Sequence, residues 1–368
     1  MKKKVVHVTF DMSIGGAEQV IYNLVENTDR DKYEVSIICL DHPIGTFGRQ
    51  LQEKGYEIIA CDRKPGFDLS VVRMIHNLIV QHNIDVLHCH QYTPYVYGLF
   101  GAAFTRAKVI FTEHGRFYPD RRRFKRILLN PLLSCFTDYV TAISMATRNA
   151  LIQYENFPRK NIKVIYNGID DSRYMLPSEV DLRQSLGINQ DALILGTVAR
   201  LDPIKNQKMM IKALGIIRSK HPNSCLLIVG DGPERENLES AALELGLSSH
   251  VLFTGFREDA HRFMKIMDIF LLTSFSEGTA MTLLEAMACG LPCIVTDVGG
   301  NPEIVKDQDT GFVVSSNDEK ALSKVIDMLI ENGDLRKKIG MAGRKRFEAN
   351  FTVDKMVGAY QGMYDGEW

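Results

Sequence analysis

Two glutamates, Glu277 and Glu285, stand eight positions apart around the start of an expected helix. An apolar strand ends just before Glu277, and Gly290 and Pro292 close the helix. The free N–H groups of the first helical turn, near residues 279–282, can hold a phosphate. Carboxylates beside a phosphate would repel it unless they accept hydrogen bonds from ligand hydroxyls, such as those of a ribose and a sugar. In the competing interpretation, Glu277 is a charge at the helix start that interacts with the helix dipole, and Glu285 is a surface residue.

Two cations, Arg200 and Lys205, follow the end of another apolar strand and stand five positions apart. Fixed cations stabilise the negative charge that develops on a diphosphate when a bond to it breaks, without a metal ion. Arginine offers a planar fork of donors, and lysine offers a point charge. Two solvated surface cations would show the same spacing, so the pair alone does not identify a ligand.

Three histidines stand at the ends of two expected strands. His88 and His90 project to one face because one residue separates them, and His114 follows the next strand. A metal site is the alternative for the His88 and His90 pair, but we find no third ligand at a useful spacing. The Asp-x-Asp segments at 29–31 and 307–309 are interpreted as solvated turns. We therefore expect no metal.

A basic cluster at residues 121–126 leads into an apolar stretch at 127–136. Large apolar side chains recur there at every fourth position, at Phe124, Leu128, Leu132 and Phe136. A basic, amphipathic segment can lie on an anionic membrane surface. A helix packed into the core with a solvated, charged start explains the pattern equally well, so both interpretations stay open here.

The elements that must position these residues alternate between strand and helix. Short runs rich in Val and Ile predict parallel strands covered by helices on both faces. We expect strands at 5–10, 34–40, 58–60, 84–88, 109–112, 139–142, 192–198, 224–229, 251–254, 269–273 and 292–296. The pattern restarts near residue 192, which predicts two doubly wound domains in the 368 residues. Ligands of such sheets bind beyond the carboxyl ends of the strands.

The composition is that of an ordinary globular protein, with 45% hydrophobic and 24% charged residues. We find no apolar run of the ~18 residues that span a bilayer and no signal-peptide core, so we expect a cytoplasmic protein. Seven cysteines without a Cys-x-x-Cys pair argue against a disulfide framework and a cysteine-rich zinc site. The net charge is +5 over residues 1–170 and −6 over the rest, which suggests an anionic partner but is too weakly basic for nucleic acid.

Six motifs, in this order over nearly the whole chain, resemble the retaining glycosyltransferases of family four, which have the GT-B fold. They are Gly15-Gly16-Ala17-Glu18, Asn167-Gly168-Ile169-Asp170, Val198-Ala199-Arg200-Leu201 with Lys205, Gly230-Asp231-Gly232-Pro233, the Glu277 and Glu285 pair, and Thr296-Asp297-Val298-Gly299-Gly300-Asn301-Pro302-Glu303. The resemblance implies two Rossmann-like domains facing across a cleft. We expect an acceptor-binding domain at 1–170, a linker at 171–177, a nucleotide-sugar-binding domain at 178–351, and a C-terminal helix at about 352–368 that crosses back to the first domain.

The resemblance also implies roles for the motif residues. Arg200 and Lys205 would bind the donor diphosphate, Glu277 the hydroxyls of the donor sugar, and Glu285 the ribose. With His114, the first three form the expected catalytic group. The other expected donor-binding residues are Gly16, Gly255, Phe256, Arg257, Gly278, Thr279, Ala280, Met281 and Thr282, and the expected acceptor side is Gly15, Gly16, His90 and His114. Thr279 stands where the family often has a bulkier residue, which leaves the sugar open.

The implied activity is retaining, metal-independent transfer of a hexose from a nucleoside-diphosphate sugar to an acceptor hydroxyl. We expect a UDP-sugar donor, no cofactor, and a lipid-linked glycan acceptor at the inner membrane face, in bacterial surface or exopolysaccharide synthesis. The alternatives are a nucleotide-sugar epimerase or hydrolase on the same fold, a dehydrogenase and a non-catalytic sugar-binding module. The dehydrogenase is disfavoured because Gly230-Asp231-Gly232 lacks the final glycine of the dinucleotide motif.

Overall fold

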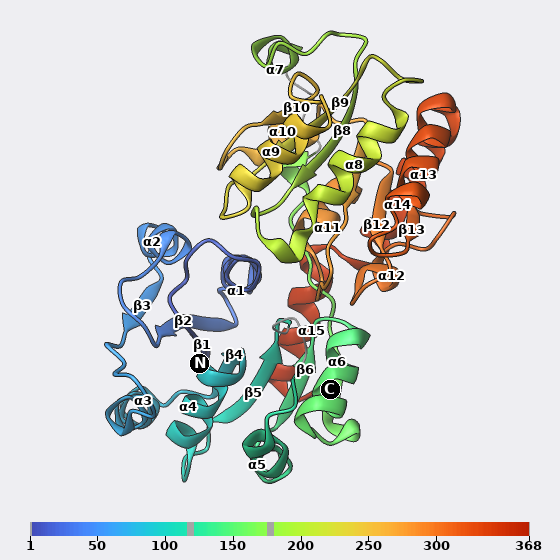
Figure 1. Ribbon diagram of the computed structural model, residues 1–368. Helices are drawn as coiled ribbons and strands as arrows, with labels where there is room; N and C mark the ends of the chain where they lie inside the picture. The colour runs from blue at the N-terminus through green and yellow to red at the C-terminus, as the bar shows by residue number, and fades with distance from the viewer. Residues whose placement is uncertain (1, 116–120, 175–179, 368) are drawn as a thin grey trace. The chain divides into compact units, whose positions relative to one another are not determined.

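The computed structural model of the chain describes residues 2–115, 121–174 and 180–367. The chain divides into two compact units, one made of residues 1–169 and 353–368 and the other of residues 170–352. Each unit is built on a parallel sheet with helices around it (Figure 1). Two doubly wound α/β sheets were predicted, and that prediction is confirmed.

The described part of the first unit contains a seven-stranded sheet in the order β3-β2-β1-β4-β5-β6-β7. Its strands are β1 (Lys3–Thr9), β2 (Tyr33–Cys39), β3 (Glu57–Ala60), β4 (Val86–His90), β5 (Lys108–Glu113), β6 (Tyr139–Ala142) and β7 (Ile162–Val164). Its helices are α1 (Gly16–Asn27), α2 (Thr46–Glu53), α3 (Leu69–His82), α4 (Tyr92–Ala102), α5 (Phe124–Ser134), α6 (Met145–Glu155) and α15 (Val353–Asp365).

The described part of the second unit contains a six-stranded sheet in the order β10-β9-β8-β11-β12-β13. Its strands are β8 (Leu193–Val198), β9 (Ser224–Val229), β10 (Val251–Phe253), β11 (Ile269–Leu272), β12 (Cys293–Thr296) and β13 (Phe312–Val314). Its helices are α7 (Val180–Ser185), α8 (Gln207–Ile217), α9 (Arg235–Glu244), α10 (Ala260–Met264), α11 (Met281–Ala288), α12 (Asn301–Ile304), α13 (Glu319–Glu331) and α14 (Gly333–Asn350).

The strand order reverses once in each sheet. The first sheet grows outward from β1 to β3 and then restarts at β4 on the other side of β1, and the second does the same at β8 and β11. Because the strands are parallel, the loops after them meet at one edge, and the reversal point is where such sheets bind ligands. Gly16 follows β1, His90 ends β4, Arg200 follows β8 and Glu277 follows β11. Four predicted site residues therefore flank the two reversal points.

The two faces of the first sheet differ in chemistry. The face toward α3 and α4 is apolar, with Val6, Val8, Leu87, Cys89 and Phe111 buried in one cluster. On the opposite face, Val5, Val86 and Ile110 are apolar, but six buried side chains of β1, β4, β5 and β6 are polar: His7, Thr9, His88, His90, Thr112 and Thr141. On that face Tyr360 and Tyr364 of α15 contact the histidines, so the C-terminal helix covers a polar layer rather than an apolar one.

Two expectations about local structure are wrong. The strand expected at 84–88 runs from Val86 to His90, because Asn83 ends α3 in a left-handed conformation and Ile84 still bonds back to Ile79. His88 and His90 therefore lie inside β4. Strands β7 and β13 were not expected, and neither were helices α4 and α14. Helix α4 is apolar almost all round, so it lacks the polar stripe by which a surface helix is recognised.

Candidate active site

The strongest cluster of predicted residues lies in the second unit, where the loops after β8 and β11 meet. Nζ of Lys205 is 2.7 Å from Oε1 of Glu277, and the hydroxyl of Ser274 donates to the same oxygen at 2.6 Å. The Glu277 side chain is 8% exposed and that of Lys205 is 25% exposed. The cation and the hydroxyl both engage Oε1 of Glu277, and a sugar hydroxyl could approach its other oxygen. Ser274 was not predicted.

Backbone contacts hold these two loops together. The amide of Phe275 donates to the carbonyl of Ile204 at 2.7 Å, and the Thr273 hydroxyl donates to the carbonyl of Asn206 at 2.9 Å. The turn that carries Lys205, Pro203–Lys205, begins at Asp202, whose side chain accepts from the amide of Ile204. The fold therefore fixes the backbone that carries Lys205, and the ion pair with Glu277 holds its ammonium.

Arg200 is exposed, unlike Lys205. Its carbonyl accepts a hydrogen bond from the side-chain amide of Gln207 at 3.0 Å, which fixes the backbone while the guanidinium stays accessible. The loop lies tightly against the glycine loop after β9. A Cβ added to Gly230 would lie 2.0 Å from the carbonyl oxygen of Ala199, and one on Gly232 would lie 2.4 Å from that of Leu201. The two glycines permit this close approach, at φ values of +140° and +158°.

The start of α11 lies next to Glu277. Among the described residues no side chain of Ala280 caps this helix, so the N–H groups of its first turn have no side-chain cap there. Thr279 is buried, and Glu285 is half-buried on the second turn. The amide of Gly300 donates to the carbonyl of Glu277 at 3.2 Å, and a Cβ at Gly299 would strike that carbonyl. The second glutamate and the Gly299-Gly300 turn thus belong to one local structure around the first glutamate.

The predicted nucleobase loop follows β10 at the same sheet edge. The amide of Gly230 donates to the carbonyl of Gly255 at 3.0 Å, which joins this loop to the glycine loop after β9. Phe256 is 55% exposed, and the guanidinium of Arg257 lies 5.4 Å from the ring centre of Phe263. An exposed aromatic ring at this position is available for stacking against a planar ligand.

In the first unit, the predicted histidines are brought together with one that was not predicted. Nδ1 of His7 lies 2.8 Å from Nε2 of His90, and Nδ1 of His90 lies 2.8 Å from Nε2 of His114. His88 bonds instead to the Tyr364 hydroxyl at 2.9 Å and to the hydroxyl of Thr112 at 2.7 Å. Burial lowers the pKa of His7 and of His114 to about 3, so these rings are neutral at pH 7.

His7 corrects the expectation that His88 and His90 have no third partner. It faces His88 across the β1–β4 ladder, and one nitrogen from each of His7, His88 and His90 lies within 4.8 Å of the others. The hydrogen bonds described above already engage both ring nitrogens of His88 and of His90. The position of His7 in an apolar run gave no signal in the sequence, because a strand pairing is needed to place it.

The glycine pair after β1 has two different environments. A Cβ at Gly15 would lie 2.2 Å from a carboxylate oxygen of Glu18, whereas one at Gly16 would meet nothing within 4 Å. Burial raises the pKa of Glu18, and the neighbouring Asp11 charge adds to that effect. The open space beside Gly16 leaves the start of α1 accessible at the reversal point of the first sheet.

Helix α5 carries a surface of exposed apolar side chains. Phe124, Leu128, Leu129, Leu132 and Phe136 are all at least half exposed, so the core-packed interpretation of this stripe is wrong. Four basic side chains are also exposed: Arg121, Arg122 and Arg123 directly before the helix, and Lys125 in its first turn. Arg126 differs, because it lies 2.8 Å from Glu155 and 3.7 Å from the ring centre of Tyr92. We call the five apolar and four exposed basic side chains the α5 surface.

Cys135 directly follows α5 and is exposed. The other six cysteines are buried or half-buried, and burial raises the pKa of Cys61 and Cys225 to about 11 and that of Cys39 and Cys289 to about 12.

None of the helices that the structure describes combines the length and apolar character needed to cross a membrane.

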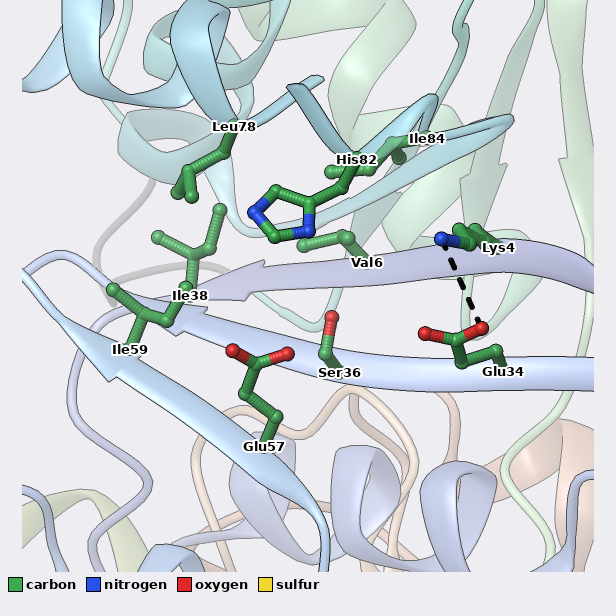
Figure 2. Close-up of a pocket in the computed structure, with 10 residues that line it drawn as sticks. All are labelled: Lys4, Val6, Glu34, Ser36, Ile38, Glu57, Ile59, Leu78, His82 and Ile84. Carbon is green, nitrogen blue, oxygen red and sulfur yellow. Dashed lines mark ion pairs between the residues drawn. The ribbon is translucent and has the colours of Figure 1, made fainter. Parts of the chain in front are cut away.

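A hollow on the first unit contains none of the predicted residues. Figure 2 shows it beside the strands β1, β2 and β3. Its polar lining includes Lys4 and Glu34, whose charged atoms lie 3.9 Å apart, and its apolar lining includes Ile38, Ile59 and Leu78. The hollow therefore has no part in the candidate site.

Comparison with known proteins identifies the family. Residues 14–173 match the family described as Glycosyltransferase Family 4, and residues 179–346 match the family described as Glycosyl transferases group 1. The putative glycosyltransferase EpsD of Bacillus subtilis is 31% identical over 82% of this chain and 84% of its own. The chain therefore belongs to the family-4 glycosyltransferases, as predicted.

Other relatives differ in what their names say they act on. The N-acetyl-alpha-D-glucosaminyl L-malate synthase of Bacillus anthracis is 28% identical over 82% of this chain and 79% of its own. The UDP-Gal:alpha-D-GlcNAc-diphosphoundecaprenol alpha-1,3-galactosyltransferase of Escherichia coli is 26% identical over 86% and 85%. The crystal structure of Anabaena HepE in complex with UDP matches all of both chains with a TM-score of 0.87 at 24% identity. Such neighbours confirm the GT-B fold.

Proposed function

We propose that this chain transfers a sugar from a UDP-sugar to a hydroxyl of a lipid-linked glycan, with retention of configuration and without a metal ion. In this reaction the acceptor oxygen bonds to the anomeric carbon, the bond to the UDP oxygen breaks, and the acceptor proton passes to the departing phosphate. Arg200 and Lys205 hold the diphosphate charge, and Glu277 accepts from the sugar hydroxyls.

One observation carries the proposal: at the reversal point of the second sheet, the cation Lys205 contacts the buried carboxylate of Glu277. Contacts between the two loops support this pair, and Arg200 is exposed on the same loop as Lys205. The Escherichia coli relative and the solved neighbour support UDP as the nucleotide, because a UDP-sugar or UDP appears in their names. Side-chain cations can stabilise a leaving diphosphate in the role a metal ion plays elsewhere.

A panel of nucleotide sugars tests the reaction. We expect UDP to be released from one UDP-sugar only when a polyprenyl-diphosphate glycan is present, at the same rate in EDTA. NMR of the product should show the donor's anomeric configuration. Release of nucleotide without acceptor would favour the hydrolase alternative, a changed sugar on intact donor would favour the epimerase, and an inverted product would overturn retention.

The α5 surface supports an acceptor held at a membrane. Its five exposed apolar side chains can enter the interfacial region of a bilayer while the four basic ones meet anionic headgroups. Each basic residue near an anionic surface contributes about 1 kcal/mol, so four can hold the protein at the membrane without a lipid anchor. The malate synthase relative supports the opposite choice, a small acceptor in solution.

Liposome flotation distinguishes an acceptor held at a membrane from a small acceptor in solution. We expect binding to vesicles of phosphatidylglycerol and phosphatidylcholine, weaker binding at high salt, and none to phosphatidylcholine alone. Replacing Arg121, Arg122, Arg123 and Lys125 by Ser should abolish binding, as should Leu128→Ser with Leu132→Ser. The matched controls are the exposed lysines of α14, Lys337, Lys338 and Lys345, changed to Ser, and exposed Leu243 of α9, changed to Ser. Wild-type protein that stays unbound at low salt would overturn the membrane proposal.

A further inference from the structure

Two buried imidazole nitrogens of the first unit have no hydrogen-bond partner among the described residues, Nε2 of His7 and Nδ1 of His114. They are the two ends of one chain of hydrogen bonds, since His7 bonds to His90 and His90 bonds to His114. We call these three residues the imidazole chain. The four inner nitrogens are hydrogen-bonded to one another, and the two end nitrogens have no hydrogen-bond partner among the described residues.

The positions of the ring protons on His7, His90 and His114 depend on one another. A neutral ring has one N–H and one lone pair, on different nitrogens. If Nδ1 of His90 holds the proton, it donates to His114, and Nε2 of His90 must accept from Nδ1 of His7. All three rings then carry the proton on Nδ1. The reverse choice at His90 puts all three protons on Nε2, and any mixed set leaves a 2.8 Å contact with two protons or none.

The surroundings keep the chain neutral and leave it isolated. Burial lowers the pKa of all three rings, and the neighbouring imidazoles lower that of His90 further. Among the described residues, the titratable side chains whose rings contact the imidazole chain are His88 on β4 and Tyr364 on α15. Both are engaged with each other, and the second nitrogen of His88 bonds to Thr112. Neither His88 nor Tyr364 therefore supplies a hydrogen bond that would change the proton positions in the imidazole chain.

We propose that His7 is a positioning residue that sets, through His90, whether Nδ1 of His114 donates or accepts a hydrogen bond. With all protons on Nδ1, His114 offers a donor that suits a ligand phosphate or carbonyl oxygen. With all protons on Nε2, it offers a lone pair that suits a ligand hydroxyl. The inference rests on the proposed function for the ligand that His114 meets, and it involves no net proton transfer.

The wild-type protein gives the first test, without any variant. In protein labelled with ¹⁵N-histidine, long-range ¹⁵N–¹H correlation spectra distinguish Nδ1–H from Nε2–H rings. We expect His7, His90 and His114 to share one tautomer at pH 7.5, and to keep sharing one when UDP and a UDP-sugar are added in turn. A mixed set, such as Nδ1–H on His7 with Nε2–H on His114, would overturn the proposal.

A variant separates relay through the chain from simple packing. His7→Phe keeps a ring in the sheet but removes both nitrogens, and Thr9→Val removes a buried, unpartnered hydroxyl from the same face of β1. We expect His7→Phe to change the tautomer ratio of His114, two hydrogen bonds away, and Thr9→Val to leave it unchanged. An unchanged His114 in folded His7→Phe protein would refute the relay.

Transfer assays connect the relay to catalysis. Losing a matched hydrogen bond of about 1.4 kcal/mol at His114 should lower kcat/KM for the acceptor about tenfold in His7→Phe. The KM for the nucleotide sugar should stay within about twofold of wild type, because Arg200, Lys205 and Glu285, the residues proposed to hold the diphosphate and the ribose, lie in the second unit. If His7→Phe changes the tautomer ratio of His114 but the wild-type protein turns over no nucleotide sugar, the proposed function is refuted. The proposal that His7 sets the tautomer of His114 would still stand. Equal loss in Thr9→Val would show that packing alone is responsible.

Discussion

At the scale of single residues, Lys205 and Glu277 show what spacing along a chain cannot reveal. Their roles were predicted separately, for a diphosphate and for a sugar, and the structure pairs them at 2.7 Å. They lie 72 positions apart in sequence, so the contact depends on which loops the sheet brings together. Across this contact the two opposite charges neutralise each other.

The Lys205 and Glu277 pair makes a measurable contribution to folding. Lys205→Met leaves a mostly buried carboxylate with only the Ser274 hydroxyl, and we expect a loss of about 1–3 kcal/mol in the free energy of unfolding. Glu277→Gln should cost less, since an amide can still bond to both neighbours. Urea unfolding of both single variants and the double variant should show that the double costs less than the sum. Additive losses would mean that the pair is not coupled.

Arg200 is expected to act in catalysis without supporting the fold, because its side chain is exposed. Arg200→Ala should lower kcat about 100-fold or more, the usual effect of removing one preorganised group that stabilises developing charge. Its melting temperature should match that of wild type. Lys208→Ala removes an exposed cation three residues after Lys205 and serves as the control. Equal kinetics for the two variants would remove Arg200 from the donor site.

At the scale of elements, the loops that carry the site depend on glycines that permit close packing. Gly230→Ala would push the Arg200 loop away, because its Cβ would lie 2.0 Å from the carbonyl oxygen of Ala199. We expect transfer to fall at least about tenfold although no charged group changes. Gly246→Ala is the matched control, since Gly246 also has a positive φ but nothing within 4 Å of its Cβ. Comparable losses of activity would show that backbone strain alone, rather than the clash, is responsible.

The elements also show where sequence prediction reaches its limit. Apolar runs predicted the buried strands, several to within one residue, because burial on both faces leaves a strong signal. The α5 stripe could not be assigned from sequence, since a core face and a membrane-binding face have the same periodicity. Only the packing of its neighbours shows that Phe124 and Leu132 are exposed. His7 was missed for a related reason, because its neighbours come from another strand.

At the scale of the whole molecule, the buried histidines predict sensitivity to acid. The pKa of an unfolded histidine is about 6.5, and burial holds those of His7, His88, His90 and His114 far below it in the folded chain. Below pH 6.5 the unfolded chain therefore binds more protons than the folded one. Stability is fully present above that pH and falls as the pH drops, by up to about 1.4 kcal/mol per pH unit for each ring, until the folded pKa is reached.

Hydrogen exchange at pH 7 and pH 5.5 locates this effect. Peptides from residues 1–169 should lose protection at the lower pH, beyond the change in intrinsic exchange rate, and those from 170–352 should keep more of it. His82→Gln alters an exposed histidine and should leave the difference unchanged. Equal loss in both units, or none, would contradict the assignment of acid sensitivity to the polar face of the first sheet.

The exposed position of Cys135 gives the protein its own reporter. At neutral pH a maleimide should label this thiol well before the six others, which are buried or half-buried. The label would be attached beside Phe136, at the end of the α5 surface, with no substitution anywhere in the chain. An environment-sensitive dye on Cys135 should shift its emission to the blue as anionic vesicles are titrated in, and Cys135→Ser protein should remain dark. Binding could then be followed in real time on an otherwise native enzyme during turnover.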